Sequence, residues 1–313
     1  MYRDRLPPEL GDRFSVAEAR GLGVPYGMLR STRLERPFHG VRAKSAAVSD
    51  TPEGMLREAA LQYARRMTEH EFFSHVAAAA IWGFPLPIGL VRRRSLDVAV
   101  FAPRRAPSGK GVIGHALSPG HAHTVRHPEH GFQIASPAST WAMLGGLLID
   151  QYDLVAAADA AVRVPMHHED PPALSTPDQL RAAVQAGRRV GVPSLRAALP
   201  RISTRARSRP ETWLRLLVID AGLPEPEVNA DVYDDRGRWL AQVDLSYPNL
   251  KIALEYEGEY HLTDPAQWAA DIARMDRLVE AGWRVIRVTK GEVFGNPTEL
   301  IARIRRAIAV ASR

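Results

Sequence analysis

The sequence predicts an α/β domain at the carboxyl end of the chain, in which helices flank a mixed sheet. Two observations predict this fold class. From residue 209 onward, short apolar runs that alternate with polar residues are interleaved with longer helical patterns, an order typical of a sheet with helices on its faces. Before that point strand patterns are sparse, so we expect a mainly helical α+β middle region and, at the amino end, a small helix-turn-helix.

The amino-terminal segment 1–46 has the pattern of a helix-turn-helix followed by a wing. Ser15 can cap a helix over 16–20, and Glu18 completes a capping box with it. The remaining parts are a glycine-rich turn at 21–25, a second helix at 26–34 and a wing at 37–43.

The second helix of such a unit lies in the major groove of DNA. Arg30 and Arg33 would be exposed on it, and Arg42 lies in the wing, so these three arginines are the candidate DNA-binding residues. The alternative is a small module that packs on its neighbour and never touches DNA.

The middle region, 47–164, and a helical and basic linker, 165–207, precede the carboxy-terminal domain. The expected elements are helices at 53–66, 75–82, 153–162, 179–189 and 192–199, a helix that residues 136–141 open, a strand at 96–101 and a loop at 102–120. A basic run at the end of the linker consists of Arg201, Arg205, Arg207 and Arg209. Such a run is either solvated or, beside a nuclease site, able to hold a phosphate backbone.

The carboxy-terminal domain, 208–313, contains a hairpin turn pattern, Asp234-Asp235-Arg236-Gly237, between its first two strands. The expected elements are a helix at 209–221, strands at 227–234, 238–246 and 250–257, a helix at 265–281, a strand at 283–289 and a helix at 297–311.

The amino-acid composition limits the kinds of function that the protein can have. The 313 residues contain no cysteine, which excludes disulfides and thiolate zinc sites. No apolar run reaches the roughly 20 residues that span a bilayer, and the start lacks the apolar core of a signal peptide. We expect a cytoplasmic protein with no membrane partner. Residues 1–45 carry a net charge of +4 and residues 208–313 one of −3, so the basic amino-terminal part suits a polyanion such as DNA.

Carboxylates recur on two expected strands of the last domain. Apolar residues flank Asp244 and alternate with Glu255 and Glu257, so the apolar side chains can face a core while the acids lie on the opposite face. Clustered carboxylates raise one another's pKa unless a cation binds among them, and Mg²⁺ or Mn²⁺ prefers oxygen ligands. Asp244 and Glu255 are therefore the candidate metal ligands, and Glu257 is a third ligand or a base that orients water.

Two further candidates have structural alternatives. Glu211 can join the site, but Ser208-x-x-Glu211 is also a capping box. His261 can act as a general acid or base, since its pKa lies near neutrality, or it can be a strand-end histidine bonded to backbone. His121 and His123 could share a strand face and bind zinc, although a polar loop explains them more simply.

These motifs resemble the restriction-endonuclease-like (PD-(D/E)xK) superfamily, and more closely the very-short-patch-repair-type endonucleases and an uncharacterised bacterial family grouped with them. The residues that carry the resemblance are Pro210-Glu211 opening a helix, Asp244 ending a strand, Glu257-Gly258-Glu259-Tyr260-His261, and a strand from Gly282 to Val288. It covers about the last third of the chain. Glu257 stands where the superfamily usually has a lysine. Lys251 shares strand parity with Glu255 and could supply that cation.

Segments 1–46 and 47–164 are similar to abortive-infection type IV antitoxins. The two resemblances imply a metal-dependent DNA endonuclease, targeted by a winged helix and using Mg²⁺ or Mn²⁺ to hydrolyse phosphodiester bonds. Alternatively, they imply a non-enzymatic, antitoxin-like DNA-binding regulator with an inactive nuclease fold, acting as a homodimer or with a toxin-like protein partner.

Overall fold

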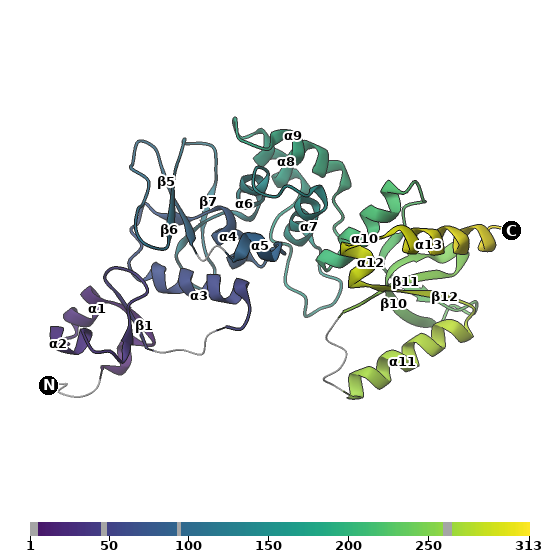
Figure 1. The fold of residues 1–313 in the computed structure, drawn as a ribbon, viewed down its shortest axis with the longest axis horizontal. Helices are drawn as coiled ribbons and strands as arrows, with labels where there is room; N and C mark the ends of the chain where they lie inside the picture. Colours follow the sequence, from purple (N-terminus) through teal and green to yellow (C-terminus); the bar gives the residue numbers. More distant parts are fainter. Residues whose placement is uncertain (1–5, 45–48, 93–94, 259–264) are drawn as a thin grey trace. The chain divides into compact units, whose positions relative to one another are not determined.

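A computed structural model of the chain describes residues 6–44, 49–92, 95–258 and 265–313 (Figure 1). The structure is a mixed α/β protein with two mixed sheets and one antiparallel sheet. The chain divides into two compact units. Unit 1 comprises Met1–Ile149 and Ser175–Leu199, and unit 2 comprises Asp150–Leu174 and Pro200–Arg313. None of the described helices combines the length and the apolar character needed to cross a lipid bilayer.

The two units group the expected segments differently from the sequence boundaries at 46, 164 and 207. Helix α7 (Gln151–Val162) belongs to unit 2 because it packs against α10 (Arg209–Asp220). Helices α8 (Pro177–Gln185) and α9 (Val192–Ala198), expected in the linker, belong to unit 1, where α8 packs against α6 (Pro137–Leu144). Apolar helix faces therefore set the division, and the proline-rich stretch that was expected to be a connection lies mostly in unit 2, up to Leu174.

The amino-terminal part of unit 1 has two short helices and a three-stranded sheet in the order β1-β3-β2. Its elements are β1 (Arg13–Ser15), α1 (Val16–Gly21), α2 (Tyr26–Leu29), β2 (Leu34–Glu35) and β3 (Val41–Lys44). The predicted capping box is confirmed, because Ser15 Oγ accepts from the Glu18 N–H and the Glu18 carboxylate accepts from the Ser15 N–H. Helix α2 ends five residues earlier than expected. A turn follows it, in which Ser31 Oγ accepts from the Arg33 N–H, and such local bonds compete with helix.

The rest of unit 1 surrounds a five-stranded mixed sheet in the order β6-β5-β4-β8-β7. Its strands are β4 (Phe72–Phe73), β5 (Leu96–Phe101), β6 (Val112–Leu117), β7 (Thr124–Arg126) and β8 (Gln133–Ala135). The helices are α3 (Pro52–Ala64), α4 (His75–Trp82) and α5 (Ile88–Val91), together with α6, α8 and α9. Helix α4 and strand β5 agree with the bounds predicted from the sequence.

Strand β6 lies within the segment that was expected to be a loop, so that prediction was wrong. Gly114, one of the glycines that favoured a loop, has a packing role in this strand instead. A Cβ atom on Gly114 would lie 1.7 Å from the carbonyl oxygen of Pro107, so glycine lets the strand pass this close to neighbouring backbone.

Unit 2 is built on a four-stranded mixed sheet in the order β12-β11-β10-β9. Its strands are β9 (Glu227–Tyr233), β10 (Trp239–Tyr247), β11 (Ile252–Glu257) and β12 (Arg284–Thr289). Strands β11 and β12 run parallel and the other pairs antiparallel. Every element expected from 209 onward is confirmed to within two residues, and the structure adds a short helix, α12 (Lys290–Phe294).

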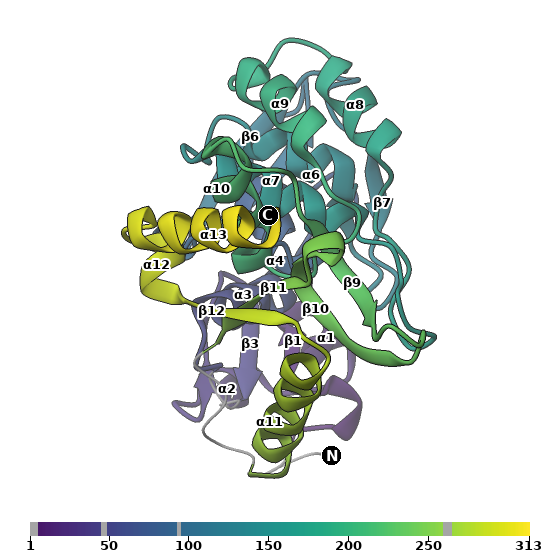
Figure 2. The ribbon, with the colours of Figure 1, turned by 90° about the vertical axis from the view of Figure 1, so that its right-hand side faces the viewer.

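Helices cover both faces of this sheet. Helix α11 (Pro265–Glu280) lies on one face, and α10, α12 and α13 (Thr298–Ala311) lie on the other (Figures 1 and 2). Leu245 and Leu254 pack towards α10 and α13, whereas Ala253 packs with Leu278 of α11. Because side chains alternate along a strand, Glu255 shares the face of Ala253 and lies on the α11 side.

Candidate active site

Three polar side chains form a row across strands β9, β10 and β11. Asn229, Asp244 and Glu255 occupy directly opposed positions in the antiparallel register. Side chains at the opposed positions of Asp244 and Glu255 share a face and lie roughly 5 Å apart, whereas Asn229 has a left-handed backbone with φ of 45° that interrupts the alternation along β9. The register is fixed by the flanking pairs Val243↔Ala230, Leu245↔Val228 and Leu245↔Leu254.

Asp244 is the centre of this row. It is half-buried, and one carboxylate oxygen accepts a hydrogen bond of 2.8 Å from the Tyr256 N–H. Burial, followed by the negative charges of Glu255 and Glu211, raises the pKa of Asp244 to about 8. The structure therefore brings three of the predicted acids close enough to oppose one another's ionisation.

Glu255 is buried and faces a cation from the helix above it. Arg274 of α11 donates to both carboxylate oxygens of Glu255, at 3.1 and 3.3 Å, and also to the carbonyl of Gln242 at 3.1 Å. Two parallel N–H···O bonds of this kind are the favoured arginine–carboxylate geometry. Arg274 is a residue of the site that sequence reasoning missed.

The cation proposed from strand parity, Lys251, is not at the site. Lys251 adopts a left-handed backbone conformation with φ of 49° just before β11 begins, so the alternation that linked it to Glu255 does not extend to it. Its ammonium group donates to Asp235 at 2.8 Å and to the carbonyl of Ala281 at 3.2 Å.

Glu211 lies in the first turn of α10 and its side chain is buried. Its N–H donates to Ser208 Oγ, as in a cap, but its carboxylate does not return to the Ser208 N–H. It accepts instead from the Arg207 N–H at 2.8 Å and from the side-chain amide of Asn229. The predicted capping box is thus half formed, and Asn229 links the carboxylate of Glu211 to the row.

Glu257 follows Glu255 by two residues at the end of β11. It is half-buried and pairs with Arg287 of β12 at 3.2 Å. The remaining candidate, His261, lies outside the described residues.

Among the described residues, the acids of unit 2 do not form a compact set of metal ligands. In the part of the chain that the structure describes, three metal-ligating side chains of unit 1, His75, Asp97 and His115, do have their ligand atoms within 4.8 Å of one another.

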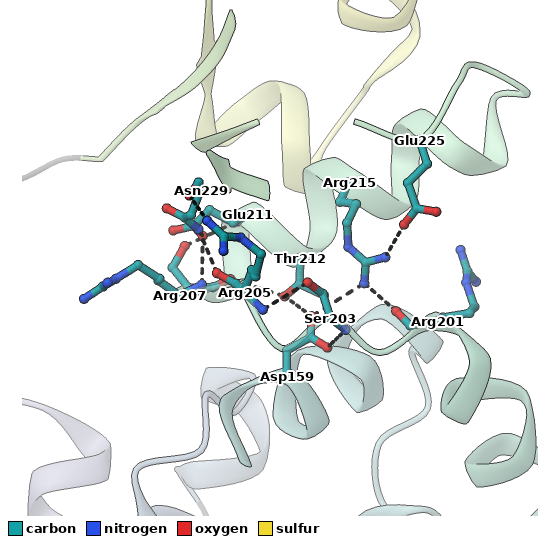
Figure 3. A network of polar contacts seen from close by, with 11 residues as sticks. Asp159, Arg201, Ser203, Arg205, Arg207, Glu211, Thr212, Arg215, Glu225 and Asn229 are labelled. Carbon is teal, nitrogen blue, oxygen red and sulfur yellow. Dashed lines mark hydrogen bonds and ion pairs between the residues drawn. The ribbon is translucent and has the colours of Figure 1, made fainter. Parts of the chain in front are cut away.

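A buried polar network supports the helix that carries Glu211 (Figure 3). Asp159 of α7 accepts from the Ser203 N–H at 2.7 Å and from the Thr212 hydroxyl at 2.8 Å, and Arg215 lies 3.6 Å away. Burial nevertheless raises the pKa of Asp159 to about 7. The network fixes α10 against α7 and so fixes where α10 begins.

The basic run before α10 is not a free row of charges. Each arginine has a partner inside unit 2: Arg201 pairs with Asp220, Arg205 donates to the carbonyls of Val228 and Asn229, Arg207 pairs with Asp170, and Arg209 pairs with Asp153. This run therefore holds the chain against β9 and α7 and is not a freely solvated row of charges, while phosphate binding by it stays a prediction.

The three DNA-binding candidates of unit 1 separate into two kinds. Arg30 and Arg33 are exposed, and the guanidinium of Arg30 stacks over Tyr26. Arg42 is buried, and it donates to the carbonyls of Leu29 and Val41. Burial lowers the pKa of Arg42. Arg42 therefore joins the end of α2 to β3, a structural role that the sequence pattern did not indicate.

A cleft of about 600 Å³ lies beside these elements in unit 1. Several cationic side chains line it, namely Arg36, Arg42, Arg66 and Lys110, together with His39. Sequence reasoning missed Arg66 and Lys110 because they come from a helix end and a loop far along the chain.

Comparison with known proteins finds relatives that match part of the chain. It is similar to the uncharacterized protein MT2308 of Mycobacterium tuberculosis strain CDC 1551 / Oshkosh and to the uncharacterized protein Rv2248 of strain ATCC 25618 / H37Rv. In each case the identity is 38% over 125 residues, which is 40% of this chain and 45% of the relative. The chain thus spans less than half the length of these curated relatives. No family model matches it, and no solved structure matches it.

Proposed function

We propose that this chain is a metal-dependent endonuclease that hydrolyses phosphodiester bonds in DNA. The observation that carries the proposal is that Asp244 and Glu255 of the sheet lie near Glu211 of α10, where burial, and then the charges of the other two acids, raise the pKa of Asp244. Such an arrangement costs the protein free energy unless a cation compensates it. All the donors are oxygens, the ligands that Mg²⁺ and Mn²⁺ prefer.

Asp244 and Glu255 would hold the ion, and Asn229 would orient Glu211 beside it. An Mg²⁺ or Mn²⁺ ion held by these residues would supply Lewis-acid chemistry, which polarises a phosphate and lowers the pKa of a water. Glu257, at the half-buried end of β11, would orient or deprotonate that water or serve as a third ligand. His261 keeps the role of general acid or base that the sequence suggests.

Arginines would supply the positive charge that the superfamily pattern assigns to lysine. Arg274 lies against Glu255 and Arg287 against Glu257, so both guanidinium groups lie at the acids. Arginine binds phosphate oxygens through two parallel N–H groups. This arrangement supports a restriction-endonuclease-like fold for unit 2 in which the cation comes from α11 or β12 instead of from the strand motif.

Unit 1 would deliver the site to DNA through a winged helix. The exposed Arg30 and Arg33 support this role, as does the basic cleft that Arg36, Arg66 and Lys110 help to line. Phosphate contacts of this type supply most of the affinity of a protein for DNA.

One observation favours a second function, that of a non-enzymatic DNA-binding regulator. Glu255 is already compensated by Arg274, and among the described residues the acids are not a preassembled three-ligand set. In that case the acids of the sheet would not catalyse cleavage. The protein would bind DNA as an antitoxin-like regulator, either as a homodimer or with a toxin-like protein partner.

A cleavage assay distinguishes the two. Purified protein is incubated with supercoiled plasmid, a mismatched duplex and single-stranded RNA, each with EDTA, Mg²⁺ or Mn²⁺. The nuclease proposal predicts nicking or cleavage of DNA only when a divalent ion is present. Retarded migration of intact DNA in every buffer would support the regulator instead.

A further inference from the structure

We propose that His75, Asp97 and His115 form a binding site for a divalent transition-metal ion of the zinc type, separate from the acids of unit 2. The three residues lie in unit 1, and neither the sequence motifs nor the proposed nuclease chemistry uses them. Their ligand atoms all lie within 4.8 Å of one another. Two imidazoles and one carboxylate are the ligand types of catalytic zinc sites, which keep a further position for water or substrate.

The fold brings these side chains together from three elements. Asp97 lies on β5, and His115 lies on β6, where its register partner is Ala99. Residues two apart on a strand share a face, so Asp97 and His115 emerge on the same side of the sheet. His75 opens α4, directly after Ser74, whose N–H donates to the carbonyl of Asp97.

Contacts within the group hold its members close to ligating geometry. His115 Nε2 lies 2.9 Å from a carboxylate oxygen of Asp97. The rings of His75 and His115 stack with centroids 3.9 Å apart. Ser74 Oγ lies 3.0 Å from Nδ1 of His75, and a partner at Nδ1 leaves Nε2 to bind an ion. Tetrahedral ligands about 2.0–2.1 Å from zinc lie roughly 3.3 Å from one another, so small rotations of the rings would complete the site.

The surroundings of His75, Asp97 and His115 favour a bound metal ion over a group of side chains that are only hydrated. Asp97 is buried, and a buried carboxylate between two imidazoles gains from a cation that all three can share. His75 has a positive φ of 45°, an unfavourable conformation for a residue with a side chain, and such strain is found where a side chain must be held in place.

The group lines a cavity of about 400 Å³, which would give the ion an open position. Apolar side chains make up most of the remaining wall, including Leu90, Ile113 and Met143. Arg189 also lines it, and its Nε is buried without a partner among the described residues. A water or small anion on the ion would thus be enclosed by apolar groups and lie near one unused donor.

Calorimetric titration tests the site in the full chain after chelator treatment, with Zn²⁺ as the probe. The wild type should bind one equivalent that His75→Ala and His115→Ala each weaken by about 100-fold or more, since even outer contacts of a metal site are worth 10–100-fold. Asp97→Asn should weaken it as well. His130→Ala is the matched control, because His130 of the same unit stacks on His127, lies 3.8 Å from Glu129 and is not among the residues that line the cavity. Asp244→Asn should also leave Zn²⁺ affinity unchanged, so the outcome does not depend on the nuclease proposal.

X-ray absorption of the zinc-loaded wild type gives a second readout that needs no variant, and it should show imidazole scattering from two histidines. Absence of a stoichiometric Zn²⁺ site in the wild type would overturn the proposal. So would equal affinity in wild type and His115→Ala, or a spectrum without imidazole ligands.

Discussion

Two acids of unit 2 with raised pKa values, Asp159 and Asp244, differ in what compensates them. Asp159 receives a backbone N–H and a hydroxyl and lies near Arg215. Asp244 receives a backbone N–H but faces two other acids. Both pKa values are raised, chiefly by burial. The difference in partners indicates a structural role for Asp159 and supports the proposal that Asp244 is a metal ligand.

Asp159 makes stability fall as the pH rises. Its pKa increases from 3.8 to about 7 on folding, so the folded protein keeps a proton that the unfolded chain releases. The stabilisation is present at low pH and is lost as the pH rises through about 7. Relative to Asp159→Asn, which cannot ionise, wild type should lose about 2 kcal/mol between about pH 5 and pH 8. Urea denaturation at both values measures the difference, and a difference independent of pH would contradict the assignment.

Arg274 should stabilise the apo protein by compensating Glu255. Arg274→Met removes two charge-assisted hydrogen bonds and leaves a buried carboxylate, so we expect a loss of about 2 kcal/mol in EDTA. Mn²⁺ should restore part of this loss, because the ion would replace the missing charge.

The matched control is Arg287→Met, whose partner Glu257 is more exposed and whose loss should stay within about 0.5 kcal/mol. Denaturant unfolding with and without Mn²⁺ gives both values. An equal loss for Arg274→Met in the two buffers would argue against ion binding at Glu255.

Sequence reasoning could predict the pairing of Asp244 with Glu255 but not the residues that complete the row. Strand parity placed both acids on one face, and the register agrees. Asn229 is opposite Asp244 because the β9–β10 register shifts by one residue between Trp239 and Ala241, and nothing in the hairpin sequence marks that bulge. Arg274 reaches Glu255 from a helix, and the packing of that helix is a tertiary property.

At the level of elements, the helices and strands of unit 2 were predictable because each of them buries one apolar face, which leaves a regular pattern in the sequence. The strands β4, β7 and β8 of unit 1 were missed because they have two or three residues each, too few to show a period. Strand β6 was missed because its glycine reads as a loop. His115 lies on β6, so the metal-ligating group of unit 1 could not be assembled from the sequence.

The close approach at Gly114 predicts that Gly114→Ala is destabilising. A Cβ there would meet the Pro107 carbonyl at 1.7 Å, and relieving such overlap by moving backbone costs about 1–3 kcal/mol. Gly89→Ala is the control, because a Cβ at that position in helix α5 meets nothing within 4 Å; it should be neutral or stabilising. Thermal unfolding of the two variants compares them. A Gly114→Ala protein as stable as wild type would place β6 elsewhere.

At the scale of the whole molecule, the chain combines a basic amino-terminal part with an acidic carboxy-terminal domain. The four sequence segments become two compact units, because helix packing between distant segments, invisible to local patterns, decides which helix belongs to which core. The uneven charge was visible in the composition, and it is the reason why we propose that unit 1 supplies the affinity for DNA.

Arg30→Ala combined with Arg33→Ala should therefore weaken DNA binding and flatten its salt dependence. Each lost phosphate contact lowers the slope of log K against log salt by about 0.9. The control is Arg305→Ala with Arg306→Ala, two exposed arginines of α13 in unit 2, which makes the same change in net charge. Fluorescence anisotropy across a salt series measures both. Equal slopes for the two double variants would reject a specific role for Arg30 and Arg33.

The most direct measurement of the central claim compares Asp244→Asn with Asp231→Asn. Both substitutions remove one carboxylate from the same sheet and keep the side-chain shape. Asp231 lies on β9, exposed, and accepts from Trp239, whereas Asp244 lies between Asn229 and Glu255. Mn²⁺ binding by calorimetry and plasmid cleavage in Mn²⁺ are measured on both variants and on wild type. The account predicts that Asp244→Asn weakens ion binding and abolishes cleavage while Asp231→Asn leaves both unchanged. Equal cleavage by wild type and Asp244→Asn would contradict it.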